Sequence, residues 1–450
     1  MIIKNRRELE TTEGRKVVLD IIEAGIERVL PETVMGAAVM YDAGSDTLTV
    51  QGDPFSLSGG RLFVIGGGKA SGLMAAKLES IIPPDRITAG VVTCKHGSGP
   101  HKTQKIDIIE AGHPVPDEQG IRGVRQMLEL KSRYGISEGD LVLCLISGGG
   151  SALMPCPVEG VSLEDKQRVT GQLLACGADI HEINRVRKHL SLVKGGRLGE
   201  HFAPARVVSL ILSDVIGNNL DVIASGPTSP DSSTFGEARW VLEKYRLREE
   251  CPVSVTAYLD KGCRGEVADT PKSVDTCRNY IIGDIRMALE AMAEKAAACG
   301  LTPVIATTGQ QGETGEAART RAREILYKQY MEYNVIILGG ETTPVLPENH
   351  GEGGRNQHYA AVTVQSMGPY FGAWTFASVG TDGSDYLAEA AGAMVDNRTG
   401  DEIREKGMDI GSYIRRHDSY GLFRKIGGAL IETGSTGTNV GDVMVYLVEQ

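Results

Sequence analysis

The sequence lacks any apolar run of 18 residues, and its first sixteen residues, MIIKNRRELETTEGRK, contain no hydrophobic signal region. A membrane-spanning helix needs about 20 apolar residues, so we expect no membrane partner, and we expect a cytoplasmic location. Positive charge is also in deficit, since 47 Lys and Arg against 58 Asp and Glu give a net charge of −11. Such a chain repels a phosphate backbone, and we expect no nucleic-acid partner.

Metal-binding and redox motifs are missing as well. The eight cysteines form no CxxC pair and no regular framework, which favours reduced, buried thiols over disulfides or a zinc site. The segment HEINRVRKH, residues 181–189, lacks the HExxH spacing of a zinc protease. Its basic residues are interpreted as a solvated helix face.

Glycine, in contrast, is abundant: 57 of the 450 residues are glycine, well above the usage of about 7% in an average protein. The glycines follow short apolar runs that alternate with helical patterns. The expected strands are RLFVIG, ITAGVVTC, KIDIIEAG, DLVLCLIS, RVVSLILSD, NYIIGD, TPVIATTG, NVIILGG, WTFASVGTDG and VMVYLVEQ. The expected helices are 9–30, 70–80, 117–133, 162–176 and 182–193. This alternation predicts an α/β fold with a parallel sheet covered on both faces.

Length and pattern together predict two or three domains. Residues 234–275 contain no clear strand and are expected to form helix and connector, so we place the boundary there and predict domains of residues 1–240 and 241–450. Ligands of open α/β sheets collect outside the carboxyl ends of the strands. The glycine-rich loops at the predicted strand ends are therefore the first places to search for a site.

The first such loop is FVIGGGKAS, which contains Gly66, Gly67, Gly68 and Lys69. It does not fit the P-loop spacing, and the third position of the GxGxxG dinucleotide fingerprint is occupied by Ser71. Backbone N–H groups, a helix N-terminus and a lysine could still bind an anion. A tight packing turn explains the loop equally well, and both interpretations stay open.

The next two loops add hydroxyl groups and an acid. LISGGGSAL places five residues after an unbroken apolar strand, a plausible nest for a carboxylate or phosphate: Ser147, Gly148, Gly149, Gly150 and Ser151. The GxSxG pattern of a serine hydrolase is absent. Asp214 in LILSDVIGNN follows another apolar strand, where it is either a functional acid or a structural cap.

Three loops of the C-terminal half carry further polar residues. GGETT and GGRNQ contribute Glu341, Thr342 and Arg355. An arginine in a glycine-rich loop suits bidentate recognition of a carboxylate or phosphate, although a surface arginine fits as well. Thr381 and Asp382 in SVGTDGSD fit an Asx or ST turn as well as a metal site.

Taken together and in this order, the motifs resemble those of one family, the class II glycerate kinases with a C-terminal MOFRL domain. The motifs are VIGGGKAS, AGHPVPDE, LISGGGSAL, INRVRKHLSLVKGGRL, LSDVIGNN, VIASGPTSPD, GGETT, GGRNQ, SVGTDGSD and TGTNVGD. The resemblance implies transfer of the γ-phosphoryl group of ATP to D-glycerate, usually at the 2-hydroxyl, with Mg²⁺ or another divalent cation. It also implies two α/β domains, a Rossmann-like first domain and a smaller second one that includes a MOFRL region at about residues 330–445, with the active site in the cleft between them.

The resemblance implies three catalytic residues: Lys69, Asp214 and Arg355. We add hypotheses for the rest of the site: residues 147–151 and Asn356 bind the acid; Gly66, Gly67, Gly68, Glu341, Thr342, Thr381 and Asp382 bind the nucleotide; and Asp214 is a metal ligand. The sequence departs from the family pattern at Asn218, Asn219, His358 and Gly441. Glycerate 3-kinase regiochemistry, an NAD(P)H-dependent hydroxypyruvate reductase and a non-catalytic acid sensor are the alternatives, and the protein is expected to be a monomer or homodimer.

Overall fold

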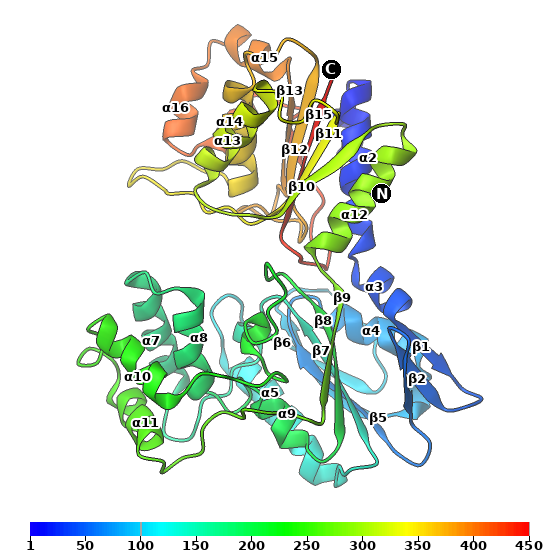
Figure 1. Cartoon of the computed structure of the whole chain (residues 1–450), viewed down its shortest axis with the longest axis vertical. Helices are drawn as coiled ribbons and strands as arrows, with labels where there is room; N and C mark the ends of the chain where they lie inside the picture. The colour runs from blue at the N-terminus through cyan, green and yellow to red at the C-terminus, as the bar shows by residue number, and fades with distance from the viewer. Residues whose placement is uncertain (100, 450) are drawn as a thin grey trace. The chain divides into compact units, whose positions relative to one another are not determined.

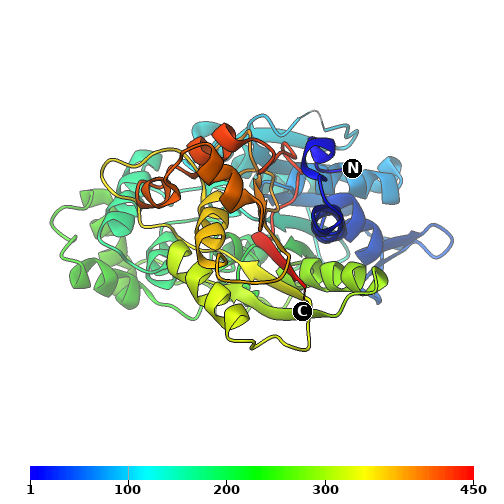
Figure 2. The ribbon, with the colours of Figure 1, turned by 90° about the horizontal axis from the view of Figure 1, so that it is seen from above.

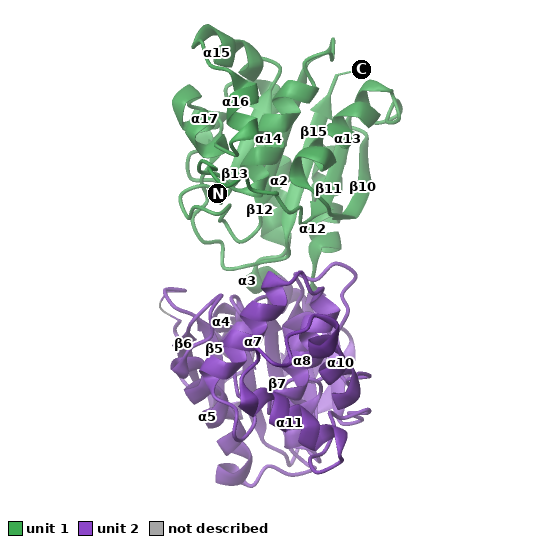
Figure 3. Ribbon diagram, turned by 90° about the vertical axis from the view of Figure 1, so that its left-hand side faces the viewer, with its two compact units in different colours: residues 1–33, 283–450 green, residues 34–282 purple. Residues whose placement is uncertain are grey.

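The computed structural model describes residues 1–99 and 101–449, and the chain forms two compact units (Figure 3). Unit 2 is a continuous segment, Val34–Ile282, whereas unit 1 combines Met1–Thr33 with Gly283–Gln450. The N-terminal and C-terminal segments therefore belong to the same unit (Figures 1 and 2). Within the described residues, no helix is long and apolar enough to cross a lipid bilayer.

A six-stranded sheet forms the centre of unit 2, with the strand order β6-β5-β4-β7-β8-β9 (Figure 1). Its strands are β4 (Leu62–Gly67), β5 (Ile87–Lys95), β6 (Ile106–Ala111), β7 (Leu141–Ser147), β8 (Arg206–Leu212) and β9 (Cys277–Gly283). The five strands from β6 to β8 pair in parallel. Strands β5 and β6 extend the sheet from one side of β4, and β7 and β8 from the other, so the order reverses between β4 and β7. The parallel sheet agrees with the pattern of the sequence, and its Rossmann-like arrangement agrees with what the family resemblance implied.

Buried apolar runs explain why these segments are strands, since every residue of β4 and β7 is buried. Helix α5 (Glu118–Tyr134), capped by Asp117 and ended by Gly135 in the left-handed conformation, shares a core with alternate residues of β4 and β7. Helix α4 (Ser71–Ile81) packs against β4, β5 and β7. The sheet thus has helical cover, as the alternation of patterns predicted.

Four helices of unit 2 form a separate small group with its own apolar core (Figure 1). They are α7 (Leu163–Ala175), α8 (Ile180–His189), α10 (Phe235–Lys244) and α11 (Val253–Cys263). Capping boxes begin α8 at Asp179 and α10 at Thr234, which fixes where these helices start. The expected helix and connector at residues 234–275 are thereby confirmed.

The remaining elements of unit 2 are short. The strands β1 (Val39–Asp42), β2 (Thr47–Val50) and β3 (Asp53–Ser56) form an antiparallel sheet. The helices are α3 (Pro31–Ala38), which begins in unit 1, α6 (Gly150–Leu153) and α9 (Arg197–Phe202), and the 3-10 helices are η1 (Pro84–Arg86) and η2 (Ile223–Ser225). The sequence analysis did not predict the three-stranded sheet, because strands of four residues carry too little alternation to be distinguished from turns.

Unit 1 contains a mixed sheet with the order β10-β11-β15-β12-β13-β14. Its strands are β10 (Pro303–Gln310), β11 (Val335–Gly340), β12 (Trp374–Gly380), β13 (Gly392–Asp396), β14 (Leu430–Ile431) and β15 (Asp442–Val448). Only β10 and β11 are parallel; every other pairing is antiparallel. The final strand, β15, lies between β11 and β12 in the interior of the sheet.

Helices α2 (Glu13–Arg28) and α12 (Ile285–Ala298) pack against each other and against this sheet. Their contact is close: a Cβ atom on Gly25 would lie 2.6 Å from Met292 Cγ. The core that β11, β12, β13 and β15 share with helices includes residues of α13 (Thr314–Leu326) and α14 (Arg355–Ser366). The other helices are α1 (Arg6–Leu9), α15 (Thr399–Glu405), α16 (Ile410–Arg415) and α17 (Ser419–Ile426).

The boundaries of the units differ from the expected division at residue 240. Strand β9, which the sequence analysis grouped with the later strands, joins the sheet of unit 2 beside β8. Helix α2 belongs to unit 1, because its apolar face, Val18, Leu19, Ile22 and Ile26, is buried there. The domains therefore do not follow a simple split of the chain into halves.

Candidate active site

The candidate site of unit 2 lies at the point where the strand order reverses. The loops after β4 and β7, which are the two glycine-rich loops of the sequence, are bonded to each other there. Lys69 N donates to Gly148 O over 2.9 Å, and Ala70 N donates to Ser147 Oγ over 2.9 Å. Gly68 N donates to Thr93 O at the end of β5. The carboxyl ends of three neighbouring strands thus meet where an open α/β sheet binds its ligand.

Close packing at this point requires glycine. Gly68 has a φ of +154°, and a Cβ atom there would lie 2.2 Å from Ser147 Oγ. A Cβ atom on Gly66 would lie 2.1 Å from Leu145 O. Both distances are far shorter than any real Cβ contact, so these glycines permit the approach of β4 and β7.

Gly149 has a different position, between a histidine and a lysine. Its φ is +82°, and a Cβ atom would lie 2.9 Å from the His113 ring and 3.2 Å from Lys69 Cγ. Asp214 follows the next strand, β8, whose last residue, Leu212, is in register with Ser147. Lys69, Asp214 and the loop of residues 147–151 therefore belong to the same edge of the same sheet.

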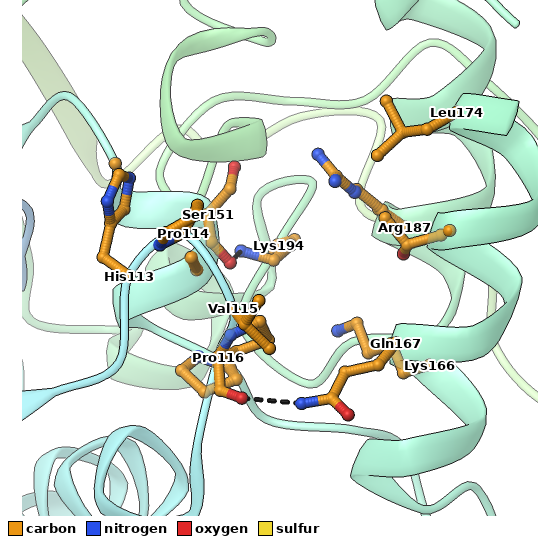
Figure 4. Close-up of a pocket in the computed structure, with 15 residues that line it drawn as sticks. His113, Pro114, Val115, Pro116, Ser151, Lys166, Gln167, Leu174, Arg187 and Lys194 are labelled. Carbon is orange, nitrogen blue, oxygen red and sulfur yellow. Dashed lines mark hydrogen bonds between the residues drawn. The ribbon is translucent and has the colours of Figure 1, made fainter. Parts of the chain in front are cut away.

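A cavity of about 490 Å³ opens beside this loop (Figure 4). Gly149 and Ser151 line it from the loop, and apolar side chains form much of the rest: Pro114, Val115, Pro116, Ala152, Pro155 and Leu174. From α7, Lys166, Thr170 and Leu174 contribute to the lining, and their spacing of four residues places them on one face of that helix. No aspartate or glutamate is among the lining residues.

Three cationic side chains point into this cavity from separate segments (Figure 4). Lys166 lies on α7, Arg187 on α8, and Lys194 in the turn before α9. Lys166 is 7% exposed and Lys194 is 2% exposed. Lys194 Nζ donates to Ser151 O over 3.0 Å, whereas Lys166 Nζ has no hydrogen-bond partner among the described residues.

The three groups share an environment that disfavours positive charge. The pKa of Lys166 is lowered from 10.5 to about 7, mainly by burial; Cys156 acts in the opposite direction, and the positive charges of Arg187 and Arg197 add smaller lowering effects. Burial, and then the charges of Lys166 and Arg187, lower the pKa of Lys194 well below its ordinary value. Burial also lowers the pKa of Arg187. An anion in the cavity would relieve this repulsion.

In unit 1, the polar residues predicted from the C-terminal loops gather at one edge of the mixed sheet. Arg355 donates from Nε and Nη2 to the two carboxylate oxygens of Asp442, over 2.5 and 3.0 Å, and from Nη1 to Glu341 Oε1 over 2.5 Å. Asp442 meets both strand ends because β15 runs antiparallel between them, pairing with Gly340 and Gly380. Burial raises the pKa of Asp442 to about 6, against the lowering effect of Arg355.

Other polar residues of unit 1, among them the predicted Asn356, Thr342, Thr381 and Asp382, have hydrogen bonds that fix the backbone. Asp385 accepts from Asn356 N and Gln357 N and caps α14. The side chain of Asn356 bonds to Ser378 Oγ and Asp385, and Thr381 Oγ1 donates to Gly441 O. Thr342 Oγ1 accepts from Thr314 Oγ1. Asp382 Oδ1 accepts from Ser384 N, as in an Asx turn.

Within the described part of the chain, no group of three or more His, Cys, Asp or Glu side chains is arranged to hold a metal ion. Magnesium in kinases is typically held by one or two carboxylates together with substrate phosphates. A dedicated cluster of protein ligands is thus not what such an ion requires.

Comparison with known proteins adds an independent result. A family model described as a domain of unknown function, DUF4147, matches residues 17–260, and the MOFRL family matches residues 334–442. The chain is 39% identical to a Pyrococcus horikoshii protein named "Glycerate 2-kinase" over 444 residues, covering 96% of this chain and 98% of that one. It is 38% identical to a Thermotoga maritima "D-glycerate 2-kinase" with the same coverage. The crystal structure of a Thermotoga maritima glycerate kinase superposes with a TM-score of 0.84 at 38% identity, covering 96% and 99% of the two chains.

The chain belongs to the class II glycerate kinase family. Two similar proteins of Agrobacterium vitis have a different name, "Putative hydroxypyruvate reductase"; one of them is 39% identical over 86% of this chain and all of that one. For this member of the glycerate kinase family, the α/β architecture inferred from the sequence is confirmed. The similarity covers nearly the full length of both this chain and its glycerate kinase relatives.

The sequence analysis of this glycerate kinase family member missed the three cavity cations and misread one helix. The basic residues of the HEINRVRKH segment were interpreted as a solvated face, and this was wrong, because Lys188 is 3% exposed and His189 is fully buried. Lys188 pairs with Asp221 and Asp231, far along the chain. A signal for Lys194 did exist: like Lys69, it adjoins consecutive glycines.

Proposed function

We propose that this protein phosphorylates D-glycerate at its 2-hydroxyl group with ATP, giving 2-phosphoglycerate and ADP. The observation that carries the proposal is the similarity to two proteins named glycerate 2-kinases over 96% of the chain. The cationic cavity at the switch point of the sheet supports it, because both substrates are anions.

Phosphoryl transfer needs alignment and charge neutralisation more than covalent chemistry from the protein. Lys69, at the N-terminal end of α4, would offset charge on the transferring group. The backbone and hydroxyl groups of residues 147–151 would position the acceptor, and Asp214 would accept or orient the proton of the attacking hydroxyl. Asp214 would also be the ligand of the divalent cation that accompanies the nucleotide.

For unit 1 we propose that Arg355 is the catalytic cation, held in a fixed orientation by Asp442 and Glu341. A guanidinium that already has two carboxylate partners is well oriented, because its bidentate bond to Asp442 fixes the plane of the group. Asn356 would assist substrate binding, and Thr342, Thr381 and Asp382 would assist nucleotide binding together with Gly66, Gly67 and Gly68.

The test is a paired assay with the purified protein. Incubation with D-glycerate, ATP and Mg²⁺ should yield ADP only when glycerate is present, and ³¹P NMR should identify 2-phosphoglycerate. A second incubation contains hydroxypyruvate and NADH. Loss of NADH absorbance there, together with no ADP in the first tube, would reverse the assignment in favour of a reductase; 3-phosphoglycerate as the product would correct the regiochemistry alone.

Asp214 can be tested in the same assay. Asp214→Asn keeps the size and polarity of the side chain but removes the proton acceptor. We expect a large fall in kcat with the KM for glycerate mostly retained. An unchanged kcat would rule out the role of Asp214 as the base.

A further inference from the structure

We propose that Lys166, Arg187 and Lys194 form an oxyanion subsite that binds a carboxylate or phosphate group of one substrate. The assignment to a substrate rests on the proposed function, whereas the binding of an anion rests on the cavity itself. Arg187 and Lys194 lie within the motif INRVRKHLSLVKGGRL, but the sequence analysis gave none of the three residues a binding role.

The strongest argument is a comparison of the two kinds of buried lysine in unit 2. Lys188, on α8, is 3% exposed and is neutralised by Asp231, itself 1% exposed, at 3.2 Å, and by Asp221 at 2.9 Å. Lys166 and Lys194 are as deeply buried, yet neither forms an ion pair with any described residue, and Lys166 Nζ lacks even a hydrogen bond. Buried charges without partners are costly. Buried charges that lower folding stability are typical of functional sites, where they bind a ligand.

The geometry shows where such a ligand would bind. The amino groups of Lys166 and Lys194 and the guanidinium of Arg187 converge on one open space (Figure 4). Gly149, which lies beside Lys69, is among the residues that line the cavity. An oxyanion held by the three cations would therefore lie in the same cavity as the loop at the switch point.

The chemistry of the lining selects an oxyanion. Two ammonium groups and a guanidinium supply only hydrogen-bond donors, and Arg187 can bind two oxygens of a carboxylate or phosphate at once. The apolar walls, which include Pro114, Val115 and Leu174, leave few competing polar partners. The glycerate carboxylate and the phosphate chain of ATP both offer this group, and the experiment distinguishes them.

The experiment measures binding of each substrate alone, with D-glycerate and with MgADP as separate probes, by isothermal titration calorimetry. The variants are Lys166→Met and Lys194→Met, and the control is Lys261→Met, which removes one charge from an exposed position of α11. A charge-assisted hydrogen bond contributes about 1.5–3 kcal/mol, which corresponds to a loss of affinity of about 10- to 100-fold. We expect a loss of this size for one probe in both cavity variants, and less than about twofold in the control.

The pattern of losses identifies the ligand group. Weaker glycerate binding assigns the subsite to the carboxylate, and weaker MgADP binding assigns it to the phosphates. Unchanged affinity for both probes in both variants would overturn the proposal. If the wild-type protein fails to phosphorylate glycerate, the proposed function is refuted, but the subsite can still be tested on the same variants with inorganic pyrophosphate as the probe. A 10-fold loss of pyrophosphate affinity in the variants supports the subsite. An unchanged affinity, or no binding by the wild type, rejects the subsite.

A measurement on the wild-type protein avoids dependence on the folding of the variants. Lysines with a lowered pKa react readily with acetic anhydride at neutral pH, and mass spectrometry reports each site separately. The ligand that binds should slow acetylation of Lys166 and Lys194 without affecting Lys261. Equal acetylation with and without D-glycerate, MgADP and pyrophosphate would refute the subsite.

Discussion

Replacing Lys166 by methionine should stabilise the protein without ligand, although most buried substitutions destabilise. The wild-type lysine has a pKa lowered from 10.5 to about 7, mainly by burial. One pKa unit corresponds to about 1.4 kcal/mol. Keeping the side chain charged in the folded state therefore costs on the order of 5 kcal/mol when the ammonium is fully protonated, and methionine, similar in length and apolar, removes that cost.

The effect has a definite dependence on pH. Burial lowers the pKa of Lys166 in the folded state relative to the unfolded state. The resulting loss of folding stability is therefore absent above about pH 10.5, increases as the pH falls, and is complete below about pH 7. The gain from Lys166→Met should be about 5 kcal/mol at pH 6 and about 1 kcal/mol at pH 9.5, as upper values, since relaxation of the wild-type site reduces both.

The assay is urea unfolding followed by circular dichroism at both pH values, with Lys261→Met as the control for net charge. Hydrogen exchange of the amides in α7 and β7 reports the stability of unit 2 separately, which is necessary because a chain with two units need not unfold in one step. Two results would show that the buried charge of Lys166 does not lower the stability of the folded protein: a Lys166→Met variant less stable than the wild type at pH 6, or a stability difference that does not depend on pH.

Three further predictions concern other parts of the structure. Gly68→Ala should destabilise the protein by about 1–3 kcal/mol and reduce kcat, because the new Cβ atom would overlap the Ser147 hydroxyl at 2.2 Å. The control is Gly160→Ala, where φ is +84° but no atom lies within 4 Å, so that only backbone strain is added. Equal melting temperatures of the two variants would contradict the overlap. Lys69→Ala should lower kcat by about 10³- to 10⁵-fold, by analogy with arginine fingers, and near-normal turnover in a steady-state assay would exclude its role. Arg15→Met should cost about 3–5 kcal/mol, because it leaves buried Asp396 without its ion pair at 2.6 Å; a urea midpoint equal to that of the wild type would show that this pair does not hold α2 in unit 1.

The strands of unit 2 could be predicted from the sequence because parallel strands buried on both faces are continuous apolar runs, as in residues 141–146. The meeting of the loops at Lys69 and Ser147 was predictable too, since both follow strands and strand ends of a parallel sheet share an edge. The pairing of β15 between β11 and β12 was not, because nothing in a single apolar run encodes its neighbours. The partner of Arg355, Asp442, depends on that pairing and was missed with it.

The cavity cations were missed for a different reason. Lys166 and Arg187 lie on amphipathic helices, where a basic residue usually marks the solvated face. Their burial results from the packing of α7 and α8 beside the loop of residues 147–151, which is a tertiary contact. Lys188 shows the same limit, because its partners Asp221 and Asp231 lie more than thirty positions away along the chain.

The interior position of β15 has a consequence for synthesis of the protein. Unit 2 is one uninterrupted segment and is complete once residue 282 has been made, whereas unit 1 needs both α2, which is made before unit 2, and β15, which is made after it. Until residues 442–448 emerge, β11 and β12 have no strand between them, and the helix from the N-terminus has only part of its docking surface. The order of translation therefore favours folding of unit 2, with its glycine-rich parallel sheet, before unit 1. Unit 1 can complete its sheet only when β15 is available to pair with β11 and β12.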